Sequence, residues 1–143
     1  MDIDPLTGLY NRRKLREYAS ELQGGILAFI DIDGFRQIND RWGHEVGDNY
    51  LKTLAEKLKE SFRYEGLFRI GGDEFLIISF QQEKDSFLRR IDELRLRLKE
   101  ITDFPSPLRI SVGISEFGKD KSFSRALHEA DLSMYWEKRE KKG

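Results

Sequence analysis

The segment Phe68-Arg69-Ile70-Gly71-Gly72-Asp73-Glu74-Phe75-Leu76-Ile77-Ile78 interrupts an apolar, β-favouring run with two glycines followed by two carboxylates. Paired glycines between strand-like segments predict a tight hairpin turn, because glycine adopts positive φ angles without steric cost. The acids follow the glycines, where the chain re-enters the sheet, and a carboxylate there needs a cation or a hydrogen-bond network. By itself the pattern favours a simple hairpin with an acidic tip. A second acidic strand end, at Asp31 and Asp33, favours a functional site.

The composition indicates one folded domain. The 143 residues are 38% hydrophobic and 36% charged, with a formal net charge of -1 and no cysteine. This length is enough for a real core. The balanced charge argues against a nucleic-acid duplex as partner, and the lack of cysteine fits a reducing compartment. No apolar run approaches membrane-spanning length and no signal peptide is visible, so we expect a cytoplasmic segment without membrane contact.

Hydrophobic periodicity predicts alternating helices and strands. The expected elements are a turn-rich N-terminal motif (3–14), a helix from about 15 that ends at glycines 24 and 25, a strand (26–32), a short helix (34–42), a glycine-rich break (43–47), a long helix (48–62), the hairpin (67–80), a helix (85–101), a strand (108–115), a helix (123–138) and a basic, frayed tail (138–143). Helices packed on a sheet define an α+β or α/β sandwich. Because the hairpin pairs antiparallel, we expect a mixed sheet.

The acids of the two strand ends are candidate metal ligands. If the strand at 26–32 neighbours the hairpin, Asp31 and Asp33 approach Asp73 and Glu74, and the period of two places the first pair on one side. Close carboxylates repel one another unless a cation joins them. Mg²⁺ held by one or two carboxylates and substrate phosphates is the usual solution. Zinc is disfavoured, because there is no cysteine and the two histidines are far apart.

A phosphate-bearing substrate also needs cations and backbone donors. Gly34 and Phe35 open a short helix beside Asp33, so their N–H groups can face an anion. Lys138 and Lys142 are candidate phosphate ligands, although lysines are also favourable at a helix C-terminus for purely structural reasons.

Asn39 and Asp48 are the polar residues best placed to bind a base. The structural alternatives are a solvated helix residue for Asn39 and a helix N-cap for Asp48. The chain has no Walker-type phosphate loop and no G-x-S-x-G nucleophile motif, which excludes P-loop NTPases and triad hydrolases.

Five motifs in order resemble the GGDEF domain, the catalytic domain of diguanylate cyclases. They are DPLTGLYNRR at 4–13, DIDGFRQINDRWGHEVGD at 31–48, GGDEF at 71–75, SVGIS at 111–115, and Ala130-Asp131 with Met134-Tyr135 and Lys138. The resemblance covers the whole chain, 1–143. It implies a five-stranded mixed sheet flanked by helices, similar to nucleotidyl cyclase and polymerase palm domains.

The resemblance also implies roles for individual residues. Asp73 and Glu74 would be catalytic, and the metal ligands would be Asp31, the Ile32 carbonyl, Asp73 and Glu74. The implied substrate-binding residues are Gly34, Phe35, Arg36, Asn39, His44, Asp48, Leu51, Gly71, Gly72, Lys138 and Lys142, with Asn39 and Asp48 on guanine. Arg36 stands where the family usually has lysine.

The implied reaction joins two GTP molecules into cyclic di-GMP with release of two pyrophosphates. Two Mg²⁺ or Mn²⁺ ions per GTP would activate the attacking 3′-hydroxyl and neutralise charge on the α-phosphate. Each domain would bind one GTP, so a homodimer is needed for catalysis. A sensory or dimerising domain is expected in a fuller chain.

The sequence departs from the family pattern at two sites. Many members carry an Arg-x-x-Asp product-inhibition motif, whose end positions here are Phe62 and Glu65, so we predict no such site. The tail reads Lys138-Arg-Glu-Lys-Lys142-Gly in place of Lys-x-x-Gly-Arg-Asn, which supplies point charges rather than a guanidinium fork.

Two other functions remain as alternatives. A catalytically silent GGDEF module could bind GTP or a protein partner and act as a regulator, but such modules usually lose the signature acids, and Gly71 to Phe75 are all present here. A palm-like nucleotidyl transferase would need a template, for which the sequence offers no surface.

Overall fold

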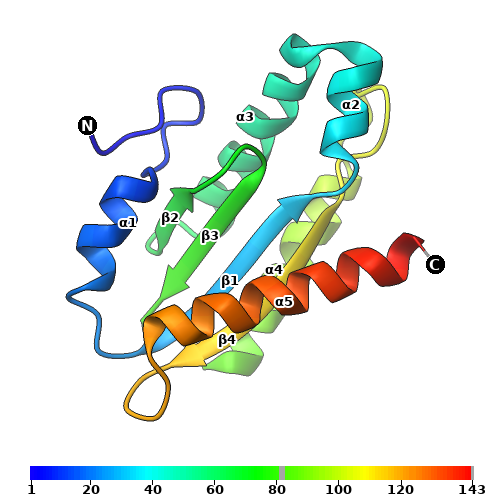
Figure 1. Cartoon of the computed structure of the whole chain (residues 1–143). Helices are drawn as coiled ribbons and strands as arrows, with labels where there is room; N and C mark the ends of the chain where they lie inside the picture. Colours follow the sequence, from blue (N-terminus) through cyan, green and yellow to red (C-terminus); the bar gives the residue numbers. More distant parts are fainter. Residues whose placement is uncertain (81–82, 143) are drawn as a thin grey trace.

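A computed structural model describes residues 1–80 and 83–142, except for the side chain of Lys142 (Figure 1). The elements in chain order are α1 (Arg12–Ala19), β1 (Gly25–Ile32), α2 (Phe35–Trp42), α3 (His44–Ser61), β2 (Gly66–Arg69), β3 (Glu74–Ser79), α4 (Lys84–Lys99), β4 (Ile110–Phe117) and α5 (Phe123–Lys142). None of the described helices is both long and apolar enough to span a membrane.

The sheet has four strands in the order β2-β3-β1-β4, and every neighbouring pair is antiparallel. The expected five-stranded mixed sheet is therefore wrong for the described residues. The hairpin inserts β3 between β1 and β2, so strands that run in the same direction are never neighbours. This is the split β-α-β-β-α-β arrangement, here extended by α5.

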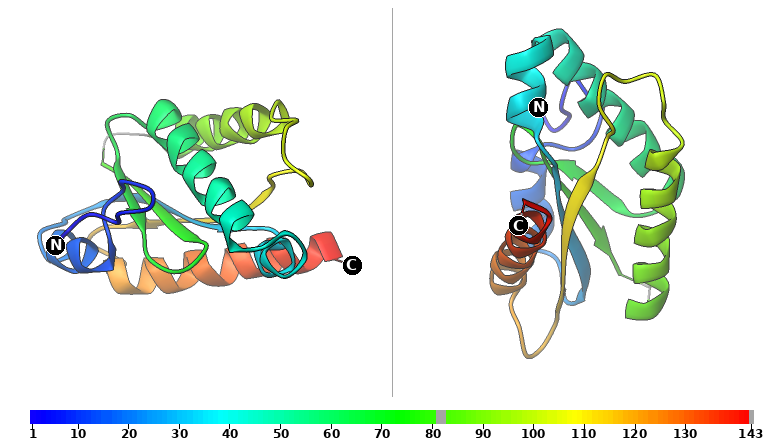
Figure 2. Two further views of the ribbon diagram at one scale, coloured as in Figure 1. Left: turned by 90° about the horizontal axis from the view of Figure 1, so that it is seen from above. Right: turned by 90° about the vertical axis from the view of Figure 1, so that its right-hand side faces the viewer.

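Helices cover both faces of the sheet. Figure 2 shows α5 on one side and α3 with α4 on the other. The side chains of β1 alternate accordingly: Ile26, Ala28 and Ile30 join the core beneath α3 and α4, whereas Leu27 and Phe29 join the core beneath α5. β1 is thus buried on both faces, which confirms the prediction of a central strand.

Three predicted helix boundaries were wrong. α1 ends at Ala19 and not at Gly24 and Gly25. α3 begins at His44, because only Gly43 breaks the chain, with a φ of 92°. Gly47 lies inside α3, where a Cβ would come within 1.8 Å of Asn39 Oδ1, so its lack of a side chain allows α2 and α3 to pack closely. α5 continues to Lys142, so the expected frayed tail is helical instead.

Candidate active site

The two acidic strand ends meet on the α5 face of the sheet. Asp31 at the end of β1 lies opposite Glu74 at the start of β3, in antiparallel register. The alternation that sends Leu27 and Phe29 toward α5 also sends Asp31 there. The predicted convergence is confirmed for Asp31 with Asp73 and Glu74.

The carboxylates of Asp31 and Asp33 both accept hydrogen bonds from lysines of α5. They therefore lie on the same side of the sheet, as predicted. Lys138 Nζ donates to Asp31 Oδ2 at 2.8 Å, and Lys141 Nζ donates to Asp33 Oδ2 at 2.8 Å. The Ser111 hydroxyl donates to Asp33 Oδ1 at 2.6 Å. Asp33 is therefore bonded at both oxygens, whereas Asp31 Oδ1 is buried with no partner among the described residues.

Asp73 lies close enough to Asp31 for the two carboxylates to affect each other. Burial and the nearby carboxylate of Asp31 raise the pKa of Asp73 to about 7, although Lys138 opposes the shift. The charge of Lys138 therefore does not offset the neighbouring carboxylates.

Glu74 belongs to the same acidic cluster. Burial and the charges of Asp31 and Asp131 raise the pKa of Glu74, against the opposing charges of Arg12 and Lys138. Its carboxylate lies over the turn, so that a Cβ on Gly71 would come within 2.0 Å of Glu74 Oε1.

The glycines of the turn have a different role from the predicted one. Neither Gly71 nor Gly72 has a positive φ, so the expectation of a left-handed turn was wrong. Gly71 is needed because Glu74 fills the space of a side chain. No atom lies within 4 Å of a Cβ placed on Gly72, which leaves the outside of the turn open.

The N-terminal motif holds this turn in place. Arg69 donates from Nε and Nη2 to the Gly72 carbonyl, at 3.1 and 2.8 Å, and from Nη1 to both oxygens of Asp4. Arg12 Nε donates to the Ile70 carbonyl at 2.9 Å. The backbone before and after Gly71 is thus fixed by side chains from elsewhere in the fold.

A cavity of about 520 Å³ opens beside the acids. It is lined by eight predicted site residues, Asp31, Gly34, Phe35, Arg36, Asn39, His44, Asp73 and Lys138, together with Gln37 and Asp40. Asp40 was missed by the sequence reasoning, although it stands four residues after Arg36 and so on the same face of α2. Asp48, Gly71, Gly72, Ile32 and Glu74 do not line this cavity, and Leu51 is buried in the core beneath α3 and α4.

The candidate base-binding pair lies where α2 packs on α3. Asp48 is partly buried within α3, which excludes the alternative role of a helix N-cap. Asn39 Oδ1 contacts the neighbouring Gly47 and is buried without a hydrogen-bond partner in the described structure. An unsatisfied buried amide oxygen is unusual and is available to a ligand donor.

A second cavity, of about 340 Å³, adjoins the first through Gly34 and Lys138 and is also lined by Asp33, Arg109 and Lys141. The sequence reasoning missed Lys141, Arg109 and Ser111. Only the pairing of β4 with β1 could have found Ser111, since it places Ser111 opposite Asp31. The side chain of Lys142, a predicted phosphate ligand, lies outside the described residues.

The acidic residues are suitable ligands for a divalent cation whose coordination shell would be completed by substrate oxygens. The buried Asp31 Oδ1 lacks a partner, and its acidic neighbours offer only carboxylate oxygens, the donors that Mg²⁺ and Mn²⁺ prefer. Within residues 1–80 and 83–142, no group of three or more His, Cys, Asp or Glu side chains surrounds an ion position. An all-protein metal cage is therefore absent from this part of the chain.

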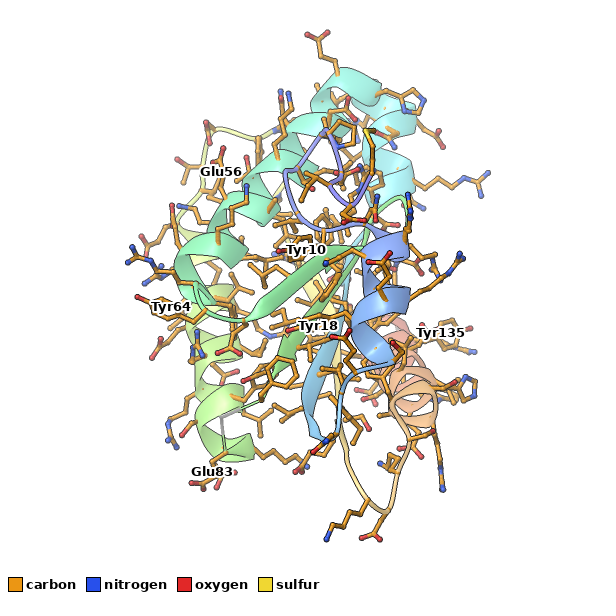
Figure 3. The ribbon with its side chains drawn as sticks, turned by 90° about the vertical axis from the view of Figure 1, so that its left-hand side faces the viewer. Tyr10, Tyr18, Glu56, Tyr64, Glu83 and Tyr135 are labelled. Carbon is orange, nitrogen blue, oxygen red and sulfur yellow. The ribbon has the colours of Figure 1, made fainter. Side chains whose placement is uncertain are left out.

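The residues at the end positions of the product-inhibition motif, Phe62 and Glu65, make contacts within the fold. Phe62 is buried and packs under the Arg90 guanidinium, 4.4 Å from the ring centroid. Glu65 pairs with Arg90 at 3.3 Å. Tyr64, between them, points into solvent at the surface (Figure 3).

We therefore expect no high-affinity binding of cyclic di-GMP at this position. Arg90 already satisfies Glu65, and Phe62 offers no donor for a phosphate. Calorimetric titration of cyclic di-GMP into the protein checks this. Submicromolar binding that is abolished by Arg63→Ala and by Glu65→Ala would refute it.

Comparison with known proteins agrees with the geometry. The family model for the diguanylate cyclase GGDEF domain matches residues 1–143. Diguanylate cyclase DosC of Escherichia coli K12 is 33% identical over 96% of this chain and 33% of its own length. Diguanylate cyclase DgcP of the same strain is 36% identical, over 96% of this chain and 45% of its own.

A solved structure has the same fold. Diguanylate cyclase SiaD from Pseudomonas aeruginosa, crystallised with its activator SiaC, superposes with a TM-score of 0.87 and 31% identity, over 96% of this chain and 58% of that one. The chain belongs to the GGDEF domain family of diguanylate cyclases. It spans less than half of the length of the curated relatives compared above.

Proposed function

We propose that this chain is the catalytic domain of a diguanylate cyclase, which converts two GTP molecules into cyclic di-GMP and two pyrophosphates. The observation that carries the proposal is the cluster of Asp31, Asp73 and Lys138 at the edge of the cavity. Acids short of a cation beside a lysine suit a metal-bound polyphosphate.

The residues around the cavity have complementary roles in this reaction. A pair of Mg²⁺ or Mn²⁺ ions would supply charge neutralisation at the α-phosphate and activation of the hydroxyl. Asp73 can accept the 3′-hydroxyl proton, since its carboxylate lines the cavity beside Asp31. The start of α2 presents backbone donors to phosphate oxygens, and Lys138 offers its ammonium.

Catalysis requires two GTP-loaded copies that face each other. In each half-reaction a bond forms between the 3′-oxygen of one GTP and the α-phosphorus of the other, and the bond from that phosphorus to the pyrophosphate breaks. Among the described residues the acids Asp31 and Asp73 line the same cavity, so each copy would supply one nucleotide. The active species is thus a homodimer.

We expect the product to depend steeply on protein concentration. If a weak dimer is the active form, a tenfold dilution lowers the activity per milligram by about tenfold. The test is incubation with GTP and Mg²⁺ or Mn²⁺ at two protein concentrations, with the product identified by mass. GTP binding without turnover, even in a dimer forced by a fused coiled coil, would instead support the silent regulatory module.

Guanine selectivity is expected to depend on Asp48. Its carboxylate suits the N1–H and N2–H₂ donors of guanine, so Asp48→Ser should reduce the preference for GTP over ATP by about 10- to 100-fold. Competition binding with the two nucleotides measures this ratio, and Asp92→Ser on the exposed surface of α4 serves as the control. Full GTP preference in Asp48→Ser would remove Asp48 from the base site.

A further inference from the structure

The last turns of α5 place lysines against the acids at the end of β1. Lys138 and Lys141, three residues apart on the helix, reach Asp31 in β1 and Asp33 in the turn just after it, each at 2.8 Å. Residues at i and i+3 share a helix face, so both lysines can face the end of β1. One helix therefore supplies both counter-ions.

The two lysines differ in how firmly they are held. Lys141 Nζ also donates to the Ile110 carbonyl at 2.7 Å and lies 3.3 Å from Glu137 Oε1. With Ser111 Oγ at 3.4 Å, four oxygens surround its three N–H donors, so Lys141 is saturated. Lys138 makes one hydrogen bond among the described residues, the one to Asp31.

Lys138 stands where it can exchange partners. Its side chain is 26% exposed and lines both cavities, whereas the Asp31 side chain is 12% exposed.

A metal ion that approaches Asp31 without a polyphosphate is therefore repelled by the Lys138 ammonium. It must displace Lys138 from Oδ2 or share the carboxylate with a like charge, and displacement leaves the ammonium without its partner. A polyphosphate that arrives with the ion offers new oxygens to Lys138. This removes the cost of releasing Asp31.

We propose that Lys138 is an exchangeable counter-ion, which suppresses metal binding at Asp31 until a polyphosphate accepts its ammonium. This inference rests on the metal role of Asp31 in the proposed function, and it adds a coupling between metal and phosphate. Because coupling between two ligands is reciprocal, the same residue makes phosphate binding favour metal binding and the reverse.

The test measures metal binding without turnover. Free Mn²⁺ is followed by electron paramagnetic resonance in wild-type protein, Lys138→Met and the matched control Lys141→Met. We expect Lys138→Met to bind Mn²⁺ about tenfold more tightly than wild type, which corresponds to the removal of a partly buried competing ion pair. Lys138→Gln gives the same comparison if the methionine variant does not fold.

A second measurement tests the other half of the exchange. Calorimetric titration with inorganic pyrophosphate, without metal, should show about tenfold weaker binding to Lys138→Met than to wild type, since the accepting ammonium is gone. Unchanged or weaker Mn²⁺ binding by both Lys138 variants would overturn the proposal. Equal tightening in Lys141→Met would also overturn it, because the effect would then be general electrostatics.

Both readouts are independent of cyclic di-GMP synthesis. If Lys138→Met tightens Mn²⁺ and weakens pyrophosphate while the wild-type protein makes no product, the exchange stands and the proposed enzyme fails. If product forms but Mn²⁺ affinity is unchanged in Lys138→Met, the enzyme stands and the exchange fails.

Discussion

Asp73→Asn is expected to lower cyclic di-GMP synthesis by about 10³-fold or more, because in the proposed function one carboxylate serves both as a metal ligand and as the acceptor of the 3′-hydroxyl proton. The amide keeps the shape of the side chain and loses both capacities. Product formation from GTP, quantified at saturating nucleotide and matched protein concentration, gives the ratio. Activity within tenfold of wild type would remove Asp73 from the chemistry.

The same substitution is expected to stabilise the metal-free protein at high pH. The pKa of Asp73 is about 7 in the folded protein, above its ordinary value of 3.8, so the folded state holds the proton more tightly than the unfolded state. Its contribution to stability therefore falls as the pH rises from about 4 to about 7, and the full cost is present at pH 8. Asparagine cannot ionise and avoids that cost.

Thermal unfolding in the presence of a chelator measures this gain. After allowance for solvent screening of a half-exposed group, about 1–2 kcal/mol is expected at pH 8, or roughly 3 to 8 °C in Tm. The difference should nearly vanish at pH 4, and Asp92→Asn on α4 should show none. A variant no more stable than wild type at pH 8 would show that Asp31 and Asp73 do not share a site.

Local patterns predicted the central strand and the acidic hairpin because both depend on neighbouring residues. The run at 26–32 is apolar at every position before Asp31, which is typical of a strand buried on both faces, and β1 is such a strand. The convergence of Asp31 with the hairpin acids followed once these two segments were assumed to be neighbours. That assumption proved correct.

The strand order could not be predicted in the same way. Whether β3 pairs with β1 or leaves that edge to β2 is decided by packing between segments about 50 residues apart, and helix-strand alternation alone suggested parallel neighbours. The predicted start of α3 was wrong for a related reason. Glycine usually weakens a helix, but at Gly47 the close approach of Asn39 outweighs that preference.

The lysines that pair with Asp31 and Asp33 could not be predicted from the sequence for the same reason. Lys141 is 108 residues from Asp33, and its role depends on where α5 crosses the sheet. No spacing in the sequence encodes that crossing. It is set by the contact between α5 and β4, in which Gly113 has the central place.

Gly113→Ala is expected to destabilise the protein strongly, by about 3 kcal/mol, at the upper end of overpacking costs. A Cβ on Gly113 would lie 1.8 Å from the Ala130 carbonyl oxygen and 2.5 Å from the Met134 nitrogen. Both atoms belong to the α5 backbone, so no side-chain rotation relieves the overlap and the helix itself must move. Equilibrium unfolding in urea measures the loss of stability.

The displaced helix is also expected to disturb the site. Lys138 lies one turn beyond Met134, so a shift of α5 away from β4 lengthens the contact from Lys138 to Asp31, and the variant loses activity even where it remains folded. Gly118→Ala is the matched control, because no atom lies within 4 Å of a Cβ at that position and its φ is not positive. The control should stay within about 0.5 kcal/mol of wild type. Equal stability of Gly113→Ala and Gly118→Ala would mean that α5 does not rest on β4 at Gly113, and the positions of Lys138 and Lys141 would then need another cause.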